Sequence, residues 1–326
     1  MIVSILLVCA GLLVLVAGAE LVVLGAARFA TLLGIAPMVI GLTIVSVGTS
    51  APELAIGVVA GLQDKGGLAV GNIAGTNLLN MLFILGLSAL LRPLPLHLQF
   101  FKLELPVLVF ASALMTFLAW DGLLSRWDGL LMLAVGIAYT VTLISMTRRA
   151  SQAARKEFRE EYGPQSVPQR ATVRSRAWYL TILLVGIALT VLGAEVLVRG
   201  AVGLATLIGV SATTIGLTIV AFGTSAPELV TTIMSTIRDD RDVAVGNLLG
   251  SSIYNILFIL SVPCMIAPGG LRVERDLLWC DIPLMAGVAL GAIPVFLTGK
   301  SISRFEGGLA IAIYVVYMLW LIFLRN

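Results

Sequence analysis

Long apolar stretches separated by short polar segments run through the chain from one end to the other. About 20 apolar residues, at 1.5 Å of rise each, are enough for a helix to cross the hydrocarbon core of a bilayer. Because backbone groups in lipid must be hydrogen-bonded within their own segment, each stretch is predicted to be an α-helix. Ten membrane-spanning helices are predicted, at residues 2–27, 37–62, 67–91, 103–120, 127–147, 177–198, 212–237, 242–267, 277–298 and 305–324.

The composition excludes a soluble enzyme. Hydrophobic residues account for 59% of the 326 residues and charged residues for 12%, which is about half of the charged share in soluble domains. A net charge of +3 is too small to indicate a nucleic-acid partner. Cys9, Cys264 and Cys280 lie in or beside apolar stretches without metal-ligand spacing, so we expect small hydrophobic side chains rather than a disulfide framework.

One polar segment is longer than the others and divides the spans five and five. Residues 148–176 contain eight Lys or Arg and three Glu. Basic residues near span ends mark the cytoplasmic side, and placing this linker inside puts fifteen basic residues inside against six outside. The prediction is a multi-pass protein of the plasma or inner membrane, with a cytoplasmic linker and both termini outside. The two halves are residues 1–147 and 177–326.

The two halves contain an internal repeat. Residues 18–88 align without a gap on residues 193–263, with 34 of 71 positions identical. Each half has an odd number of spans, so the second copy must enter the membrane in the opposite sense to the first. The predicted fold is an all-α membrane protein whose ten transmembrane helices form two inverted five-helix repeats. Secondary transporters recurrently use this plan, with the substrate bound near the midplane between the repeats.

Four acidic residues lie well inside the predicted spans and form two repeat-related pairs, Glu20 with Glu195 and Glu53 with Glu228. A carboxylate in hydrocarbon costs at least about 2.5 kcal/mol, so an intramembrane acid is by default a functional candidate. Glu53 and Glu228 are the stronger pair, because each ends the same repeated segment, Gly-Thr-Ser-Ala-Pro-Glu.

The repeated segment covers residues 48–53 and 223–228. Its proline lacks an N–H and crowds the carbonyl four residues earlier, so the helix is expected to bend or break and to free backbone oxygens as ligands. Thr49 and Ser50 lie four and three residues before Glu53, which is expected to place their hydroxyls on the same helix face as the carboxylate. The equivalent residues of the second half are Thr224, Ser225 and Glu228.

The next span of each half carries a second polar stripe at spacings of three and four residues. Its members are Asn72, Thr76, Asn77 and Asn80 in the first half and Asn247, Ser251, Ser252 and Asn255 in the second. Amides and hydroxyls of this kind can simply hydrogen-bond one helix to another. Their repetition beside a pair of carboxylates favours a binding site instead.

Oxygen ligands alone indicate a hard cation. Calcium takes six to eight oxygens, and two carboxylates with one freed carbonyl from each broken helix supply about six. Asn80 and Asn255 extend that set, and two negative charges balance one calcium ion or two sodium ions. Magnesium fits poorly because it gives up its waters reluctantly, and zinc or copper is not expected without His or Cys in the stripe.

These residues closely resemble the paired alpha repeats of the cation/calcium exchanger superfamily, most of all its prokaryotic sodium/calcium exchangers. Both Gly-Thr-Ser-Ala-Pro-Glu segments match the family pattern, as do residues 71–77 and 246–252. With the ten-span layout, the resemblance covers nearly the whole chain. It implies a secondary active antiporter, not an enzyme, that exchanges sodium for calcium by alternating access. The bound ions are the transported Ca2+ and Na+, and neither a cofactor nor an obligate protein partner is implied.

The resemblance also implies a role for each repeated polar residue. It implies that the carboxylates of Glu53 and Glu228 are ligands shared by both ions, and that Thr49 and Thr224 offer their backbone carbonyls to calcium. The residues implied to line the flanking sodium sites are Ser50, Thr76, Ser225 and Ser251. The amides of Asn80 and Asn255 are implied to close the middle of the cluster. Some relatives, potassium-dependent ones among them, have Asp in place of Asn255, so potassium co-transport is not expected. Glu20 and Glu195 lie in the span that in this family slides against the rest, and their role is open between gating and helix anchoring.

Proton/calcium antiport on the same fold is the nearest alternative, because a pair of carboxylates can load protons as well as sodium. The hydroxyls of Thr49, Ser50, Thr224, Ser225 and Ser251 suit sodium, which needs oxygen ligands that a proton does not. An intramembrane hydrolase lacks its parts, since the spans hold no His-Glu-x-x-His, no Gly-x-Ser-x-Gly and no histidine. A passive channel is disfavoured because mirrored broken helices describe an occluded site better than an open pore.

Overall fold

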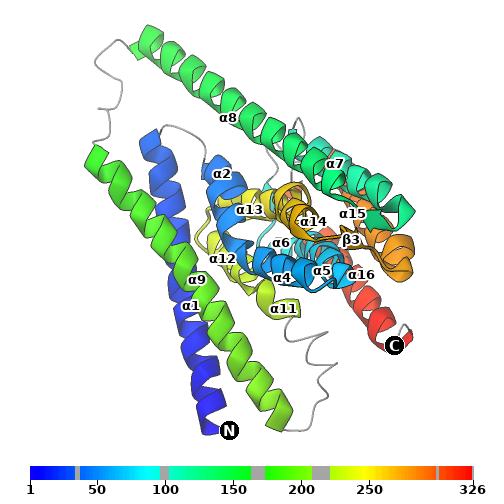
Figure 1. Ribbon diagram of the computed structural model, residues 1–326. Coiled ribbons are helices and arrows are strands. Elements are labelled where there is room, and N and C mark those ends of the chain that lie inside the picture. The colour runs from blue at the N-terminus through cyan, green and yellow to red at the C-terminus, as the bar shows by residue number, and fades with distance from the viewer. Residues whose placement is uncertain (34–36, 96–102, 163–172, 208–220, 299–300, 325–326) are drawn as a thin grey trace.

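The structure is a computed structural model that describes residues 1–33, 37–95, 103–162, 173–207, 221–298 and 301–324. Almost all of these residues are helical (Figure 1). Within these described ranges, seven helices are long and apolar enough to cross a membrane, and the bent pair Gly41–Thr49 and Ala51–Leu62 makes an eighth. The described part of the chain is a helical, multi-pass membrane protein.

The helices of the first half are α1 (Ile2–Leu33), α2 (Pro37–Ile40), α3 (Ser46–Thr49), α4 (Ala51–Leu62), α5 (Gly66–Leu78), α6 (Leu85–Leu91), α7 (Leu105–Leu118) and α8 (Arg126–Tyr162). Those of the second half are α9 (Val173–Leu207), α11 (Ala221–Thr224), α12 (Ala226–Ile237), α13 (Arg241–Tyr254), α14 (Ser261–Ile266), α15 (Ile282–Thr298) and α16 (Arg304–Leu324). Wider π-helical turns are η1 (Gly41–Val45), η2 (Leu79–Ile84), η7 (Asn255–Ile259) and η8 (Leu277–Asp281), and η4 (Ala119–Asp121) is a short 3-10 helix.

Three helices extend beyond their predicted boundaries. One of them is α9, which runs from Val173 to Leu207, beyond both ends of the predicted span 177–198. α1 reaches Leu33 instead of ending near residue 27, and α8 continues to Tyr162, well into the predicted polar linker. The linker begins with Ala, Gln, Arg, Lys and Glu, which are good helix formers even where no apolar stretch marks a span. Residues 163–172 lie outside the described residues, as does the first part of the predicted span 212–237.

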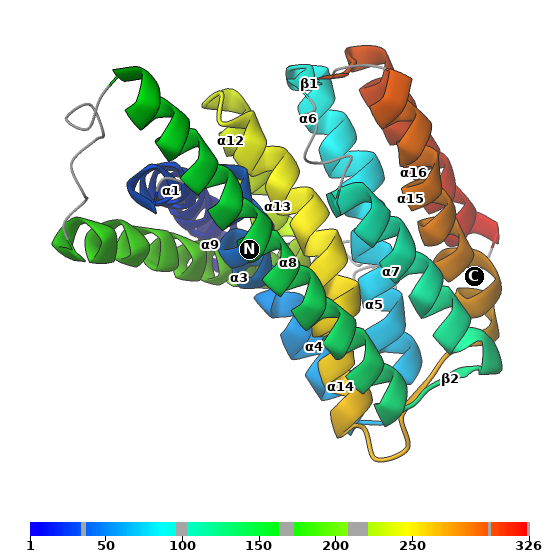
Figure 2. The same ribbon diagram turned by 90° about the horizontal axis from the view of Figure 1, so that it is seen from above.

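Two continuous spans form the centre of the bundle. One runs through α5, η2 and α6, and the other through α13, η7 and α14. In each, 78% of the most apolar stretch is buried inside the protein, against 11% in α16, which lies at the edge of the bundle (Figure 2). The two central spans carry the polar stripes, so these side chains face protein rather than lipid.

α1 and α9 form a separate antiparallel pair on one side of the bundle (Figures 1 and 2). Their contact is made by glycines spaced seven residues apart, at positions 11, 18 and 25 in α1 and 186, 193 and 200 in α9. A Cβ added to Gly18 would lie 2.5 Å from the Thr190 backbone nitrogen, and one added to Gly193 would lie 2.4 Å from that of Leu15. Such glycines let two membrane helices approach until their backbones touch.

Two short antiparallel sheets tie the halves together at the two ends of α7. β1 (Leu94–Pro95) pairs with β4 (Ser301–Ile302), with Leu94 opposite Ile302. β2 (Leu123–Leu124) pairs with β3 (Leu271–Arg272), with Leu123 opposite Arg272. Because α7 connects β1 to β2, the sheets lie at opposite ends of the bundle, as Figure 2 shows. Each sheet joins one connection of the first half to one of the second.

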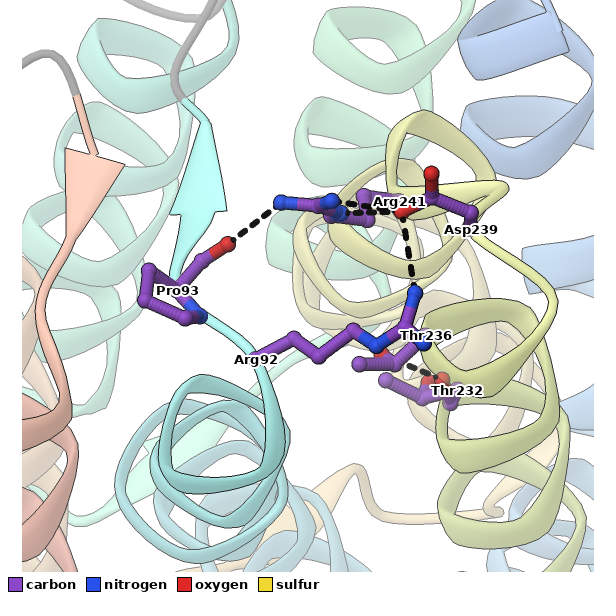
Figure 3. Close-up of polar contacts among 6 residues, drawn as sticks. All are labelled: Arg92, Pro93, Thr232, Thr236, Asp239 and Arg241. Carbon is purple, nitrogen blue, oxygen red and sulfur yellow. Dashed lines mark hydrogen bonds and ion pairs between the residues drawn. The ribbon is translucent and has the colours of Figure 1, made fainter.

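Asp239 links the turn between α12 and α13 to the end of α6 (Figure 3). Arg92 Nη1 donates to Asp239 Oδ1 at 3.3 Å, and Arg241 Nε donates to the same oxygen at 2.7 Å. Arg241 Nη1 also donates to the Pro93 carbonyl at 2.9 Å. The hydrogen bond from Arg241 holds the pKa of Asp239 below its ordinary value.

Replacing Asp239 by Asn is expected to lower the apparent unfolding temperature slightly, because two arginines lose their anion. A lowered pKa means that the carboxylate stabilises the fold above its unfolded-state pKa, and that this contribution is lost as the pH falls through the lowered value. The difference between D239N and the unsubstituted protein should therefore shrink on acidification.

Asp240→Asn is the matched control for this substitution. Burial, together with the neighbouring carboxylates of Asp239 and Asp242, raises the pKa of Asp240, so its charge does not favour the fold. Removing that charge should leave the unfolding temperature at neutral pH unchanged or slightly higher. Equal losses in D239N and D240N would contradict the role given to the Asp239 ion pairs.

Candidate functional site

The first repeated segment breaks its helix as the proline predicts. α3 ends at Thr49 and α4 begins at Ala51, with a bend of 50° between the two parts of the span. Ser50 between them has φ −83° and ψ 14°, and Pro52 has no N–H with which to continue the helical ladder. Carbonyl groups at the end of α3 therefore lack helical donors and can serve as ligands.

The second repeated segment has the same local geometry in its described part. α11 ends at Thr224 and α12 begins at Ala226, and Ser225 between them has φ −89° and ψ 6°. The break expected from each proline is confirmed in both halves. The sequence thus places two helix interruptions, with their free backbone oxygens, inside the protein.

Glu53 and Glu228 are fully buried in the first turns of α4 and α12. Each carboxylate lies at the N-terminal end of its helix, where the helix dipole favours negative charge. The two are close enough for their charges to interact. Two buried acids that repel each other need a cation or a proton between them.

The hydroxyls of the repeated segments cross between the halves. Ser50 Oγ donates to Glu228 Oε1 at 3.0 Å, and Ser225 Oγ lies 3.5 Å from Glu53 Oε1, to which it donates. Thr76 Oγ1 and Ser225 Oγ are 3.4 Å apart. The spacing of three and four residues predicted the Thr49 and Ser50 hydroxyls on the helix face of Glu53, but the helix is interrupted at Ser50, and Ser50 bonds to Glu228. Each serine instead reaches the acid of the other half.

Asn247 is a central positioning residue for which the sequence suggested no specific role. Its Oδ1 accepts a hydrogen bond from Thr49 Oγ1 at 3.4 Å, and its Nδ2 donates to Thr232 Oγ1 at 3.3 Å. Its backbone carbonyl accepts from Ser46 Oγ at 3.0 Å. Asn247 thereby joins α3, which ends at the first break, to α12. Its membership of the repeated polar stripe was the signal that could have identified it.

All the remaining predicted site residues are buried on the central spans or at the second break. Thr76, Ser251, Asn80 and Asn255 are at most 4% exposed, and Thr224 is 9% exposed. Asn255 Nδ2 donates to Asn77 Oδ1 at 3.4 Å, so the two stripes meet at this point. Asn80 lies within η2 and Asn255 begins η7, and π-helical turns of this kind frequently occur at functional sites.

Several oxygens of this cluster have no hydrogen-bond partner among the described residues. They are Glu53 Oε2, Glu228 Oε2, Asn80 Oδ1, Asn255 Oδ1 and Ser251 Oγ. Buried polar atoms in native proteins are nearly always satisfied, so a group of orphaned oxygens calls for an ion or water between them. All the potential metal ligands in this set are oxygens, which suit Ca2+ and Na+ and not a soft metal.

Glu20 and Glu195 lie outside this cluster and have cationic partners. Glu20 Oε1 accepts a hydrogen bond from Arg238 Nη2 at 2.6 Å, which links α1 to the end of α12. Glu195 pairs with Arg199 one turn further along α9. Both side chains are about half exposed, so neither is a buried ligand. Whether they gate transport or only anchor helices stays a prediction.

A comparison with known protein families decides the relationship. A family model described as "Sodium/calcium exchanger protein" matches residues 3–145 and 178–323. The chain belongs to the sodium/calcium exchanger family. The family consists of membrane transporters and not enzymes, as expected from the sequence.

Similar proteins place the chain near prokaryotic members of this family. It is 36% identical to inner membrane protein YrbG of Escherichia coli (strain K12) over 266 residues, which cover 81% of this chain and 80% of that protein. It is 30% identical to sodium/calcium exchanger MaX1 of Methanosarcina acetivorans, with 99% of each chain covered. The solved sodium-calcium exchanger NCX_Mj, soaked with 10 mM Na+ and zero Ca2+, matches with a TM-score of 0.83 at 27% identity, covering 99% of both chains. The resemblance to prokaryotic exchangers is confirmed.

Proposed function

We propose that this family member exchanges sodium for calcium across the membrane as a secondary active antiporter with alternating access. The observation that carries the proposal is the pair of buried glutamates, each bonded to a serine of the other half and each keeping one oxygen without a partner among the described residues. Two such carboxylates bind one divalent ion or two monovalent ions with the same net charge. Calcium and sodium therefore compete for one site, and their alternation gives exchange.

The proposed ligands are the ten residues of the repeated segments and stripes. Glu53 and Glu228 coordinate whichever ion is bound, and Thr49 and Thr224 add their backbone carbonyls to calcium. The flanking sodium sites use Ser50, Thr76, Ser225 and Ser251, and Asn80 and Asn255 complete the middle of the cluster. This arrangement is consistent with the orphaned oxygens on the central spans.

The proposed architecture is ten spans in two inverted five-helix halves. To the eight spans counted above, the shorter apolar helix Leu105–Asp121 and the helix that includes α12 add two. The small sheets support the inversion, because exchanging the two halves turns the β1–β4 pair into the β3–β2 pair at the opposite end of the bundle. A symmetry that swaps the two ends is what an inverted repeat requires.

The proposed orientation has the linker in the cytoplasm and both termini outside. Basic residues gather on the linker side. At the other end, Trp120 and Trp279 pack edge to face with ring centroids 5.4 Å apart, and both are 63% exposed, as is common for interfacial tryptophans. Trp127 is 79% exposed in the same region at the start of α8. These aromatics fit the outer interface of a plasma or inner membrane.

The unequal contacts of the α1–α9 pair support alternating access. Glu20 of α1 bonds to Arg238 at the end of α12. The repeat-equivalent contact would join Glu195 of α9 to Gln63 at the end of α4, but Glu195 pairs with Arg199 of its own helix. An exchanger whose site is closed to one side of the membrane should show this difference between the contacts of Glu20 and those of Glu195. The opposite state would bring Glu195 towards the end of α4.

Calcium flux in proteoliposomes tests the proposal. Vesicles loaded with sodium and diluted into sodium-free medium with calcium should take up calcium, and uptake should stop when internal sodium is replaced by an organic cation. The competing function is proton/calcium antiport on the same site. Uptake that follows a pH gradient and ignores sodium would establish that alternative and overturn sodium exchange.

A further inference from the structure

A third buried glutamate lies away from the repeated segments. Glu104 is fully buried in the π-helical turn that leads into α7, at residues 103–104. Neither of its carboxylate oxygens has a hydrogen-bond partner among the described residues. Unlike Glu53 and Glu228, it has no repeat-related glutamate facing it and no serine bonded to it in the part of the chain that the structure describes. The exchange mechanism proposed above makes no use of it.

The described surroundings of Glu104 supply no positive charge. From α8, Tyr139 lies within electrostatic range of the carboxyl group, and the Tyr139 hydroxyl also lacks a partner in the described part of the chain. From α13, Tyr254 packs against Tyr139 with ring centroids 6.0 Å apart, and its hydroxyl shares a 2.9 Å hydrogen bond with Thr140. α15 and η7, which also contact α7, contain no ionisable residue. In α13, the ionisable residues besides Tyr254 are Arg241 and Asp242, in its first turn.

The second half contains the same arrangement with its hydrogen bond made. Asp281 precedes Pro283 at the start of α15 as Glu104 precedes Pro106 at the start of α7. Tyr317 follows the helix-capping Ser303 by the same interval as Tyr139 follows Ser125. Tyr317 Oη donates to Asp281 Oδ1 at 2.7 Å. The acid of the second half is thus hydrogen-bonded, whereas Glu104 in the first half is not.

We propose that Glu104 is a proton-binding site, separate from the cation site, and that it carries a proton in this conformation. An isolated carboxylate in a low-dielectric interior is far more costly than the neutral acid. One carboxylate and one phenol give too few oxygens for calcium, and no group of three or more His, Cys, Asp or Glu surrounds a common point in the described residues. A proton is the ligand that satisfies a lone acid of this kind.

The position of Glu104 connects its proton to the ion cluster. Tyr254, which packs on Tyr139, immediately precedes Asn255, and Asn255 begins η7. Loss of the proton would leave a charge beside Tyr139, whose hydroxyl has no partner among the described residues. Turning the Tyr139 hydroxyl toward Glu104 would disturb its packing against Tyr254, the residue before Asn255. Proton occupancy of Glu104 is therefore expected to influence cation exchange without the proton being a ligand of the same site.

Labelling with an apolar carbodiimide tests the proposal on the unsubstituted protein in lipid. This reagent reacts with protonated carboxyl groups in apolar surroundings: the carboxyl oxygen bonds to the central carbon, the acid proton moves to a nitrogen, and no group leaves. Mass spectrometry of peptides should find Glu104 labelled, with the yield falling as the pH rises. Saturating Ca2+ should protect Glu53 and Glu228 and leave the label on Glu104.

The calcium arm separates this proposal from the proposed function. Protection of Glu53 and Glu228 reports on cation binding, whereas Glu104 labelling is expected with or without Ca2+. Absence of label on Glu104 under conditions that label the calcium-free Glu53 and Glu228 would mean that Glu104 is ionised and paired, and would overturn the proposal.

Infrared spectroscopy gives a readout that does not depend on reagent access. In saturating Ca2+, the carbonyl stretch of a protonated carboxylic acid should be present in the unsubstituted protein and lost in Glu104→Gln. Asp281→Asn is the matched control, because Asp281 already accepts a hydrogen bond from Tyr317. The D281N variant should keep the band. Loss of the band in D281N and its retention in E104Q would assign the proton to Asp281 and contradict the proposal.

Discussion

Replacing Glu53 or Glu228 by glutamine should abolish sodium-driven calcium uptake. Glutamine keeps the size of the side chain and one carbonyl oxygen but removes one of the two charges that balance the ion. A unit charge about 4 Å from a monovalent cation contributes about 4 kcal/mol at an effective dielectric constant near 20. The interaction is twice as large for calcium, which carries two positive charges. Losing even a fraction of it weakens calcium affinity by about 100-fold or more.

The same variants separate lost binding from lost folding. Without calcium, removing one of two buried acids that repel each other should leave the protein as stable as before or more stable. The unsubstituted protein should gain thermal stability when calcium is added, since a ligand that binds only the folded state stabilises it, and E53Q and E228Q should not. The exposed Glu274→Gln is the control and should transport normally. Normal transport by both E53Q and E228Q would refute the site.

Replacing Gly18 or Gly193 by alanine should separate α1 from α9 and destabilise the protein by about 1–3 kcal/mol, the usual cost of inserting a methyl group into a packed interface. The added Cβ would lie 2.5 Å from the backbone nitrogen of Thr190 or 2.4 Å from that of Leu15. Neither contact can be relieved by rotating a side chain, because the opposing atoms are backbone. The helices must therefore move apart.

Thermal unfolding of the purified protein in detergent measures this effect, with Gly291→Ala as the matched control. Gly291 lies in α15 with nothing within 4 Å of an added Cβ, so G291A should be neutral or slightly stabilising because alanine favours helix. The conclusion about the α1–α9 contact would fail if G18A, G193A and G291A unfolded at the same temperature.

The parts of the structure that could be predicted from the sequence depend on local chemistry or on the repeat. Apolar length marks helices such as Gly66–Leu91 and Arg241–Ile266 to within about a residue of the expected ends. Pro52 and its counterpart in the second half predict the two breaks because a missing N–H acts within one turn. Glu53 and Glu228 stand out because buried acids are costly wherever the helices pack.

The parts that could not be predicted depend on how distant segments pack. Ser50 bonds to Glu228 rather than to Glu53, and helical spacing carries no information about the partner once the helix is broken. Glu104 lies near the end of its span, where an acid resembles an interfacial residue, and only packing reveals that it is buried. The π-helical turns at Asn80 and Asn255 leave no clear mark in the order of apolar and polar residues.

The crossed bonds from Ser50 to Glu228 and from Ser225 to Glu53 bear on how such a chain could have arisen. A half-length ancestor could not place its own serine on its own acid in this way. Two copies inserted upside down relative to each other would have supplied both bonds, so a dual-topology homodimer is a natural precursor. Gene fusion would then have made the pairing permanent. After fusion, each copy could change only in ways that kept its hydrogen bonds to the serine and the glutamate of the other copy.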